Sequence, residues 1–424
     1  VNSENEYDAP EIDKDVLEPF LEENDEKAED TADATKVEAK QIKETHEEIK
    51  NVDIVHTPEK EQEVLFIKEK CYRLNKVLRD FGIKAVPITE ENVLVAARFV
   101  RFKIELRSGE TIRNLEKYKQ DISREIEAFG EIMIDNIKGT RYVGMDVPFE
   151  RNGNTLELLE NLSLLNASSG NLDILAGQKP DSNIDILDVS KAPHILISGT
   201  TGSGKTVFLY SMIVSLISKH SKDNLEIVIV DPKQTDFHFF KDLPHLRDNK
   251  IITDPEEALK MLDEINSIEK EHRTQMLIES NSRDIESYNA KNPSNPMKRL
   301  VVFIDEYADL VKAAETLGIR KDFEARLCML AQRVRNLGIH LVIATQRPSA
   351  SIVTTALKAN IPVRISFRLP AHQDSMTILD RTGAEDLLGK GDMLAMTETD
   401  YYRMQGFYIS EEDLQEYLRK FKDE

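Results

Sequence analysis

The chain has 424 residues, of which 40% are hydrophobic and 6% aromatic, enough to bury one large core and a smaller second one. The formal net charge is −21, but residues 1–50 hold 18 acidic and six basic side chains and so account for −12 of it. This composition excludes a wholly disordered chain and predicts a globular protein with an acidic appendage.

Residues 1–61 are predicted to be an acidic linker, disordered or loosely helical. They are rich in Glu, Asp, Lys, Ala and Thr and nearly without aromatics, so they cannot bury enough apolar area to offset the entropy of ordering. A solvated spacer is favoured over a partner-binding or regulatory segment. Because the first residue is Val1, upstream domains or partner proteins are left open.

Hydropathy and cysteine usage bear on the compartment. No stretch approaches the 18 or more apolar residues of a membrane helix, and there is no signal-peptide pattern. We therefore expect a cytoplasmic chain, with membrane association only through regions outside it. Cys71 and Cys328 lie in apolar helical contexts without metal-type spacing to any histidine, which favours core thiols in a reducing compartment.

Residues 62–150 are predicted to form a small α/β domain. Apolar side chains between residues 67 and 81 recur at three- and four-residue steps, which indicates a helix that ends at Gly82. Residues 93–106 are typical of extended structure, and the apolar face within residues 112–126 predicts a second helix.

Short apolar runs broken by Gly, Pro and Asn follow in residues 131–190, as expected for strands and hairpins that link this unit to the next. From residue 191 onward, apolar strand candidates alternate with helical patterns, which predicts a parallel sheet with right-handed crossovers. The predicted strands are residues 195–198, 225–230, 300–304, 340–344 and 363–367.

One helix of this region has a clear start signal. Asp254 is placed to cap it, Pro255 stands in the first turn, and two glutamates follow at the positive end of the helix dipole. The predicted buried face of this helix consists of Leu259, Leu262, Ile265 and Ile268.

A glycine-rich run between residues 199 and 206 carries the strongest chemical signal. It reads Gly199-Thr200-Thr201-Gly202-Ser203-Gly204-Lys205-Thr206, which fits G-x-x-x-x-G-K-[ST] between a predicted strand and a predicted helix. In that context backbone N–H groups and the helix N-terminus bind phosphate oxygens, Lys205 reaches the β- and γ-phosphates, and Thr206 ligates Mg²⁺. The run therefore predicts a nucleotide-binding phosphate loop rather than a chance glycine turn.

An acidic pair, Asp305-Glu306, follows the apolar run 300–304. A carboxylate at the carboxyl end of a buried strand can hold the Mg²⁺ shell, and the next one can orient or deprotonate the attacking water. We assign the metal to Asp305 and the water to Glu306. An acidic pair after a strand is more often a solvated loop, but its place downstream of the phosphate loop favours a Walker B site.

An ordered series of short motifs resembles the FtsK/SpoIIIE family of DNA translocases. The resemblance spans about residues 75 to 424, and its most specific parts are the Ala-Thr-Gln-Arg-Pro-Ser run and the final Gly-Asp-Met-Leu. Besides the phosphate loop and Pro193-His194 ahead of it, the motifs are Asp231-Pro232-Lys233, Leu243-Pro244-His245, residues 305–310, Gly338-Ile339-His340-Leu341, residues 344–349, residues 358–362, Thr377-Ile378-Leu379-Asp380 and Gly391-Asp392-Met393-Leu394.

The resemblance implies an architecture and a function. Residues 151–424 would form a RecA-like P-loop NTPase motor with a parallel sheet, joined through residues 144–148 to the small α/β domain. Six copies would form a ring around double-stranded DNA and hydrolyse ATP with Mg²⁺ to push the duplex along. A mobile-element, defence or restriction system is the expected setting.

The resemblance also implies two further catalytic residues. Gln346 would lie beside the γ-phosphate and sense its loss. Arg335 corresponds to the family's candidate arginine finger, which acts on the neighbouring subunit's nucleotide. An ordinary solvated arginine at a helix end is an equally weighted interpretation of Arg335.

The DNA contacts implied by the resemblance are Arg347, Lys358 and His372. The net acidity of the chain does not argue against DNA, because phosphate contacts need only local positive charge. His372 stands where the family usually carries Lys, and Met376 where it usually carries Arg. These two differences predict weaker binding of DNA or a different substrate. The chain ends soon after residues 403–407, so no sequence-reading winged helix and no sequence-guided direction are expected.

Two alternatives remain beside DNA translocation. A secretion-type ATPase of the same superfamily would act on proteins and bind no DNA. A scaffold whose nucleotide site only gates assembly is disfavoured because Lys205, Asp305 and Glu306 are all present.

Overall fold

The computed structural model describes residues 59–149 and 155–421. The predicted linker, residues 1–61, lies outside the described part except for its last three residues, which belong to helix α4 (Glu59–Asp80). The chain divides into two compact units between Lys76 and Val77, within this helix.

A four-stranded antiparallel sheet lies in residues 93–148, in the order β1-β2-β4-β3. Its strands are β1 (Val93–Val95), β2 (Phe99–Glu105), β3 (Met133–Asn136) and β4 (Tyr142–Pro148), and two short helices, α5 (Ile112–Lys117) and α6 (Lys119–Glu125), stand between β2 and β3.

The single helix predicted over residues 112–126 is wrong, because Tyr118 breaks it. This residue has φ −101° and ψ 12°, outside helical geometry. Its ring stacks on that of Phe81 at a centroid distance of 5.0 Å, a contact between residues distant in sequence that local periodicity cannot reveal.

A ten-stranded sheet forms the centre of the larger part, in the order β6-β5-β14-β13-β12-β7-β11-β10-β8-β9. The six strands from β12 to β9 are parallel, and the four from β6 to β13 are antiparallel additions at one edge. The strands are β5 (Asp173–Gln178), β6 (Ile184–Asp188), β7 (His194–Ser198), β8 (Leu225–Val230), β9 (Leu246–Ile252), β10 (Arg299–Ile304), β11 (Ile339–Thr345), β12 (Val363–Phe367), β13 (Asp392–Met396) and β14 (Tyr401–Gln405).

The five parallel strands predicted from the sequence are confirmed, each to within one residue at either end. They are continuous apolar runs because both faces of the parallel part are covered. The four antiparallel edge strands and the parallel strand β9 were not placed individually by the sequence, since their apolar runs are short or interrupted by polar residues.

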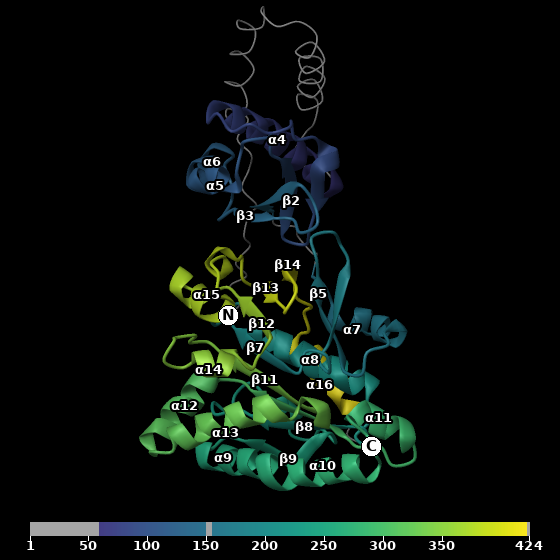
Figure 1. Ribbon diagram of the computed structural model, residues 1–424. Helices are drawn as coiled ribbons and strands as arrows, with labels where there is room; N and C mark the ends of the chain where they lie inside the picture. The colour runs from purple at the N-terminus through teal and green to yellow at the C-terminus, as the bar shows by residue number, and fades with distance from the viewer. Residues whose placement is uncertain (1–58, 150–154, 422–424) are drawn as a thin grey trace, which may run out of the picture. The chain divides into compact units, whose positions relative to one another are not determined.

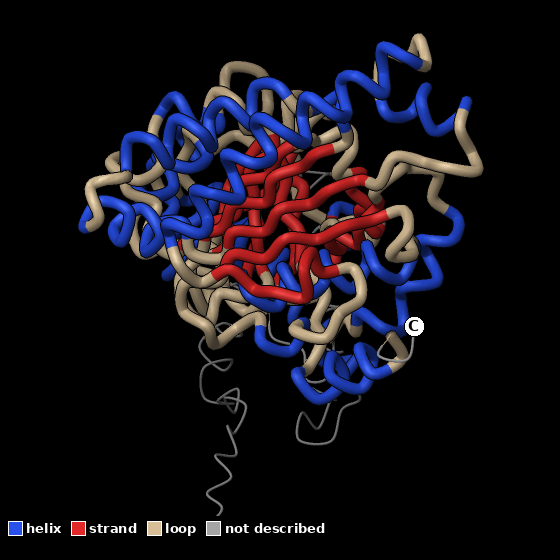
Figure 2. The backbone as a smooth tube through the Cα atoms, turned by 90° about the horizontal axis from the view of Figure 1, so that it is seen from below, coloured by secondary structure: helices blue, strands red, loops and turns tan. Residues whose placement is uncertain are grey.

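Helices cover the two faces of this sheet and define two cores. Figure 2 shows the strands side by side with helices on both sides of them. One core takes α8 (Lys205–Lys219) and α16 (Glu411–Arg419), and the other takes α9 (Pro255–Glu264), α12 (Tyr307–Thr316), α13 (Arg320–Arg333) and α15 (His372–Leu379) (Figure 1). The remaining α-helices are α7 (Leu158–Asn161), α10 (Lys270–Glu279), α11 (Ile285–Lys291) and α14 (Thr355–Lys358).

Helix α9 starts as predicted, because the Asp254 carboxylate accepts hydrogen bonds from the N–H groups of Glu256 and Glu257. The prediction that Ile268 is buried is wrong, since 69% of it is exposed. A π-helical turn, Ile265–Glu269, follows α9 and rotates the later residues away from the face set by 3.6-residue periodicity.

Both cysteines lie in helices and no disulfide joins them; Cys71 is buried and Cys328 is partly buried. Within the described residues, no helix is both long and apolar enough to cross a membrane.

Candidate nucleotide-binding site

The glycine-rich run connects β7 to α8, in the strand, loop and helix order that the sequence predicts. Gly204 caps α8 with φ 107°, a left-handed conformation that L side chains rarely adopt. A methyl group on it would lie 2.5 Å from the backbone nitrogen of Gly391, whose N–H donates to the Ser203 carbonyl at 2.8 Å. The loop before β13 therefore contacts the phosphate loop so closely that position 204 has room only for glycine.

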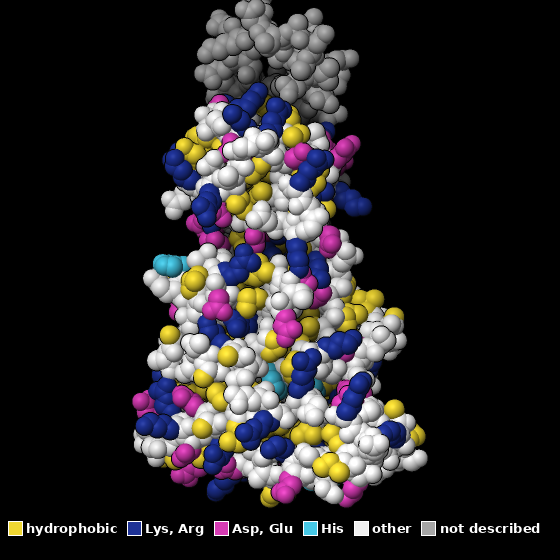
Figure 3. All heavy atoms as spheres, in the orientation of Figure 1, with side chains coloured by type: hydrophobic (Ala, Val, Ile, Leu, Met, Phe, Trp, Pro, Cys, Tyr) yellow, Lys and Arg dark blue, Asp and Glu magenta, His cyan; other side chains and the backbone are white. Residues whose placement is uncertain are grey.

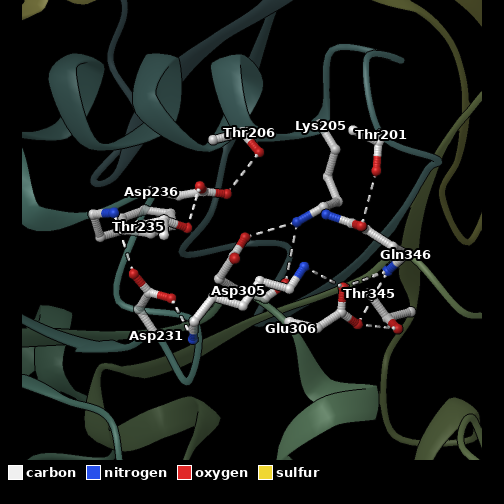
Figure 4. Close-up of polar contacts among 12 residues, drawn as sticks. Thr201, Lys205, Thr206, Asp231, Thr235, Asp236, Asp305, Glu306, Thr345 and Gln346 are labelled. Atoms are coloured by element: carbon white, nitrogen blue, oxygen red, sulfur yellow. Dashed lines mark hydrogen bonds and ion pairs between the residues drawn. The ribbon is translucent and has the colours of Figure 1, made fainter.

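Lys205 and Asp305 form a buried ion pair at the centre of the site (Figure 4). Lys205 Nζ lies 2.7 Å from Asp305 Oδ1 and also donates to the Asp305 carbonyl at 3.1 Å. Burial raises the pKa of the Asp305 carboxyl; Lys205 opposes this rise, and the negative charges of Asp236 and Asp231 add to it. Asp305 Oδ2 is buried and has no hydrogen-bond partner among the described residues.

The Glu306 carboxylate is held on both oxygens. Thr345 donates its hydroxyl to Oε1 at 2.9 Å, and the Gln346 N–H lies 3.1 Å from each oxygen. Lys233 Nζ contacts Oε2 at 3.4 Å. Because β10 and β11 are parallel neighbours, Glu306 and Gln346 emerge at the same sheet edge, which fixes the direction of this carboxylate.

Gln346 connects the acidic pair to the phosphate loop. Its backbone N–H binds Glu306, while its side-chain Oε1 accepts a hydrogen bond from the Thr201 hydroxyl at 3.2 Å. The structure thus brings four of the sequence-predicted catalytic residues together, namely Lys205, Asp305, Glu306 and Gln346 (Figure 4).

The loop after β8 adds residues to which the sequence assigned no role. Asp231, buried at the end of β8, accepts hydrogen bonds from the N–H groups of Lys233 and Gln234 at 3.0 Å and of Phe237 at 3.3 Å. This turn directs Lys233 toward Glu306 and Asp236 toward Thr206, whose hydroxyl lies 3.4 Å from Asp236 Oδ2. The Asp-Pro-Lys motif after a predicted strand was the signal available in the sequence.

The residues present fit a magnesium nucleotide. Mg²⁺ prefers oxygen ligands and is usually held by a hydroxyl, one or two carboxylates and substrate phosphates. Such oxygens are supplied next to the phosphate loop by the Thr206 hydroxyl and by the buried Asp305 Oδ2, which has no partner in the described part of the chain. These two residues are the candidate metal ligands that the sequence indicates.

Arg335 lies away from the site of its own chain. It begins the short 3-10 helix Arg335–Leu337, which precedes β11, whereas Gln346 follows the other end of that strand. Its side chain is exposed. The structure therefore separates Arg335 from the other predicted catalytic residues by the length of a strand, as a residue acting on a neighbour would require.

The three predicted DNA contacts do not share one environment. Arg347 and His372 are exposed and follow the carboxyl ends of β11 and β12. Lys358, at the end of α14, pairs with Asp380 at 2.7 Å, and Arg364 contacts the same carboxylate. On the face in Figure 3, basic and acidic side chains are interspersed.

Comparison with known proteins identifies the family. The FtsK/SpoIIIE family profile matches residues 164–350. The DNA translocase FtsK of Caldanaerobacter subterraneus subsp. tengcongensis is 35% identical over 375 residues, 88% of this chain and 51% of that protein. The DNA translocase FtsK of Haemophilus influenzae is 33% identical over 377 residues, 82% of this chain and 69% of that protein.

A solved structure supports the fold. The pCW3 conjugation coupling protein TcpA, in its monomer form with ATPγS, superposes with a TM-score of 0.58 at 24% identity, covering 83% of this chain and 99% of that one. At this identity the likeness establishes the fold alone, and it confirms the predicted α/β P-loop motor architecture. The family is shown by the Haemophilus influenzae relative, of which this chain covers 69%, and the family profile agrees: the chain belongs to the FtsK/SpoIIIE family.

Proposed function

We propose that this chain is a P-loop ATPase that uses ATP and Mg²⁺ to translocate double-stranded DNA, as a ring of six copies. The relatives that it matches over most of its length are named DNA translocases, which supports the substrate. The chain spans 51% of the first of these relatives, so the activity of the whole protein is inferred from this part. A mobile-element or defence setting stays a prediction.

The observation that carries the proposal is the convergence of Lys205, Asp305 and Glu306 beneath the phosphate loop. The loop and the N-terminus of α8 bind phosphate oxygens through backbone N–H groups and the helix dipole. The Lys205 ammonium neutralises β- and γ-phosphate charge. When bound by Thr206 and Asp305, Mg²⁺ supplies further charge compensation to the leaving phosphates.

Glu306 is the proton acceptor of this mechanism. Its hydrogen bonds from Thr345 and the Gln346 N–H fix the carboxylate, so that it orients a water and takes its proton as the water attacks the γ-phosphate. Gln346 also contacts Thr201 of the phosphate loop. Because Gln346 binds both Thr201 and Glu306, a movement of the loop on phosphate release shifts the Glu306 carboxylate through Gln346 alone.

The assembly is supported by the position of Arg335 at the opposite end of β11 from Gln346. In a ring, that edge of one subunit can present a guanidinium to the nucleotide of the next, which stabilises transition-state charge. DNA phosphates would be contacted by the exposed side chains of Arg347 and His372.

The proposal is tested by measuring ATP hydrolysis with linear duplex DNA, with single strands and without DNA. We expect duplex DNA to stimulate the parent protein most, and a Glu306→Gln variant to stay slow under all three conditions. Steady hydrolysis by the parent with no response to either DNA would refute the DNA substrate and favour the secretion-type alternative. Absence of hydrolysis in the parent would refute the ATPase itself.

A further inference from the structure

Asp236 contacts the phosphate loop, and among the described residues no cationic side chain pairs with it. Its Oδ2 accepts the Thr206 hydroxyl at 3.4 Å, and its Oδ1 accepts the Thr235 hydroxyl at 2.9 Å. In the described part of the chain, no lysine or arginine pairs with it, whereas Asp305 pairs with Lys205 and Glu306 contacts Lys233. A bare carboxylate beside a triphosphate site is repulsive unless a cation lies between them.

Contacts with helix α8 hold Asp236 in place. The Tyr210 hydroxyl donates to the Asp236 carbonyl, and Tyr210 stands four residues after Thr206 on α8, so one helix contacts Asp236 twice. The ring of Tyr210 packs against those of Phe237 and Phe240, at centroid distances of 5.6 and 5.7 Å. These contacts fix the loop against α8.

A second carboxylate, that of Asp305, lies near Asp236: its pKa is raised by burial and also by the negative charge of Asp236. Asp305 is 1% exposed, and its Oδ2 is buried without a hydrogen-bond partner among the described residues. In Figure 4 the carboxylates of Asp305 and Asp236 lie on the same side of the Lys205 ammonium, which contacts Oδ1 of Asp305 and leaves its Oδ2 without a partner among the described residues. An unpaired buried carboxylate oxygen is costly and indicates a missing positive partner.

The geometry points to Asp236 as a further ligand, direct or through a water, of the Mg²⁺ that accompanies the nucleotide, with Tyr210 as the residue that positions it. Thr206, Asp305 and Asp236 then supply a hydroxyl and two carboxylates, a set of oxygens suited to this ion. The inference rests on the proposed nucleotide site and adds the loop after β8 to its metal side.

The experiment measures binding rather than turnover. The affinity of a fluorescent ATP analogue is titrated with Mg²⁺ and with EDTA, for the parent and for Asp236→Asn, which keeps the side chain's shape. We expect the variant to lose about 10-fold in affinity with Mg²⁺. In EDTA its affinity should be unchanged or higher, because a negative charge near the phosphates is gone.

Three further variants separate the metal role from a structural one. Asp223→Asn removes the same charge from an exposed position before β8 and should match the parent in both conditions. Tyr210→Phe keeps the packed ring but removes the hydroxyl, and should reduce only the Mg²⁺-dependent affinity. Asp236→Glu restores a carboxylate and should recover part of it, which keeps the test valid if Asp236→Asn folds poorly.

Electron paramagnetic resonance of Mn²⁺ in place of Mg²⁺, with ATPγS, provides an independent readout, and Asp236→Asn should weaken Mn²⁺ binding similarly. If Asp236→Asn lost nucleotide affinity equally with Mg²⁺ and in EDTA, Asp236 would only support the loop and the inference would be overturned. The inference would also be overturned if the variant's affinity matched the parent's in both conditions. A parent protein with no metal-dependent nucleotide binding would instead overturn the proposed site as a whole.

Discussion

Lys205 Nζ lies 2.7 Å from Asp305 Oδ1, and both side chains are almost fully buried, at 3% and 1% exposure for the two residues. Breaking a buried pair leaves one uncompensated charge and typically costs about 3 to 5 kcal/mol, whereas removing both charges costs far less. The pair is therefore both a structural element and part of the candidate phosphate site.

For this reason Lys205→Ala should abolish nucleotide binding and also lower the free energy of unfolding by about 3 kcal/mol. The double variant Lys205→Ala/Asp305→Asn should recover a large part of that stability without recovering binding. Urea unfolding of the parent, both single variants and the double variant gives the coupling energy. Additive losses would show that the two charges do not stabilise each other.

Glu306→Gln should retain ATP binding but hydrolyse ATP at least about 100-fold more slowly, because the amide cannot accept a proton. The substitution preserves the side chain's shape, so the loop is spared. Single-turnover hydrolysis and a nucleotide-binding titration measure the two effects. Hydrolysis at the parental rate would mean that another group activates the water.

Arg335→Ala should lose hydrolysis while keeping ATP affinity, and mixing it with Lys205→Ala should restore activity at interfaces that pair an intact arginine with an intact nucleotide site. Activity is measured across mixing ratios, with ring formation checked in parallel. Rings that form without rescue at any ratio would shift attention to exposed Arg333, since Arg364 is already engaged by Asp380.

Arg347→Ala should weaken duplex binding across unrelated sequences and reduce the log–log salt slope by about one. Lys358→Ala should change the slope less, because Asp380 already neutralises Lys358. Lys321→Ala, at an exposed position on α13, serves as the control. Equal slopes for the parent and the Arg347 variant would remove this residue from the DNA path.

Two buried histidines predict a pH dependence of stability. Burial lowers the pKa of His194 to about 4 and that of His340 to about 3, and the Leu341 N–H donates to His194 Nδ1 at 3.1 Å. An unfolded histidine titrates near pH 6.5, so between these values the unfolded state binds more protons than the folded one. The contribution of the two neutral histidines to the free energy of unfolding is therefore complete above pH 6.5, and it is lost as the pH falls toward 4 for His194 and 3 for His340.

Urea unfolding at pH 7.5, 6.5 and 5.5 measures this effect, with about 1 kcal/mol lost per histidine over the last step. His340→Leu should reduce the slope of stability against pH, whatever its effect on stability at pH 7.5. A slope equal to the parent's would show that His340 accepts a proton in the folded state.

The antiparallel edge of the large sheet contains a buried charge network that the sequence did not indicate. Arg403 on β14 contacts Asp392 on β13 at 2.7 Å and Asp146 on β4 at 2.9 Å. These three residues come from separate motifs, and their pairing depends on strand register between distant segments.

Local features alone determined much of this protein. The phosphate loop, the Asp305-Glu306 pair and five of the six parallel strands followed from glycine spacing and continuous apolar runs, which depend on neighbours in the chain; β9, with polar residues at its centre, did not. The cap of α9 was likewise visible in its own residues.

Tertiary structure decided which groups meet. The contacts of Glu306 with Thr345 and Lys233, and of Thr206 with Asp236, cross between elements that are adjacent at a sheet edge but distant in sequence. The pairing of Lys358 with Asp380 has the same origin. Side-chain hydrogen bonds and ion pairs depend on distances of a few ångströms after packing, and periodicity along the chain contains no information about them.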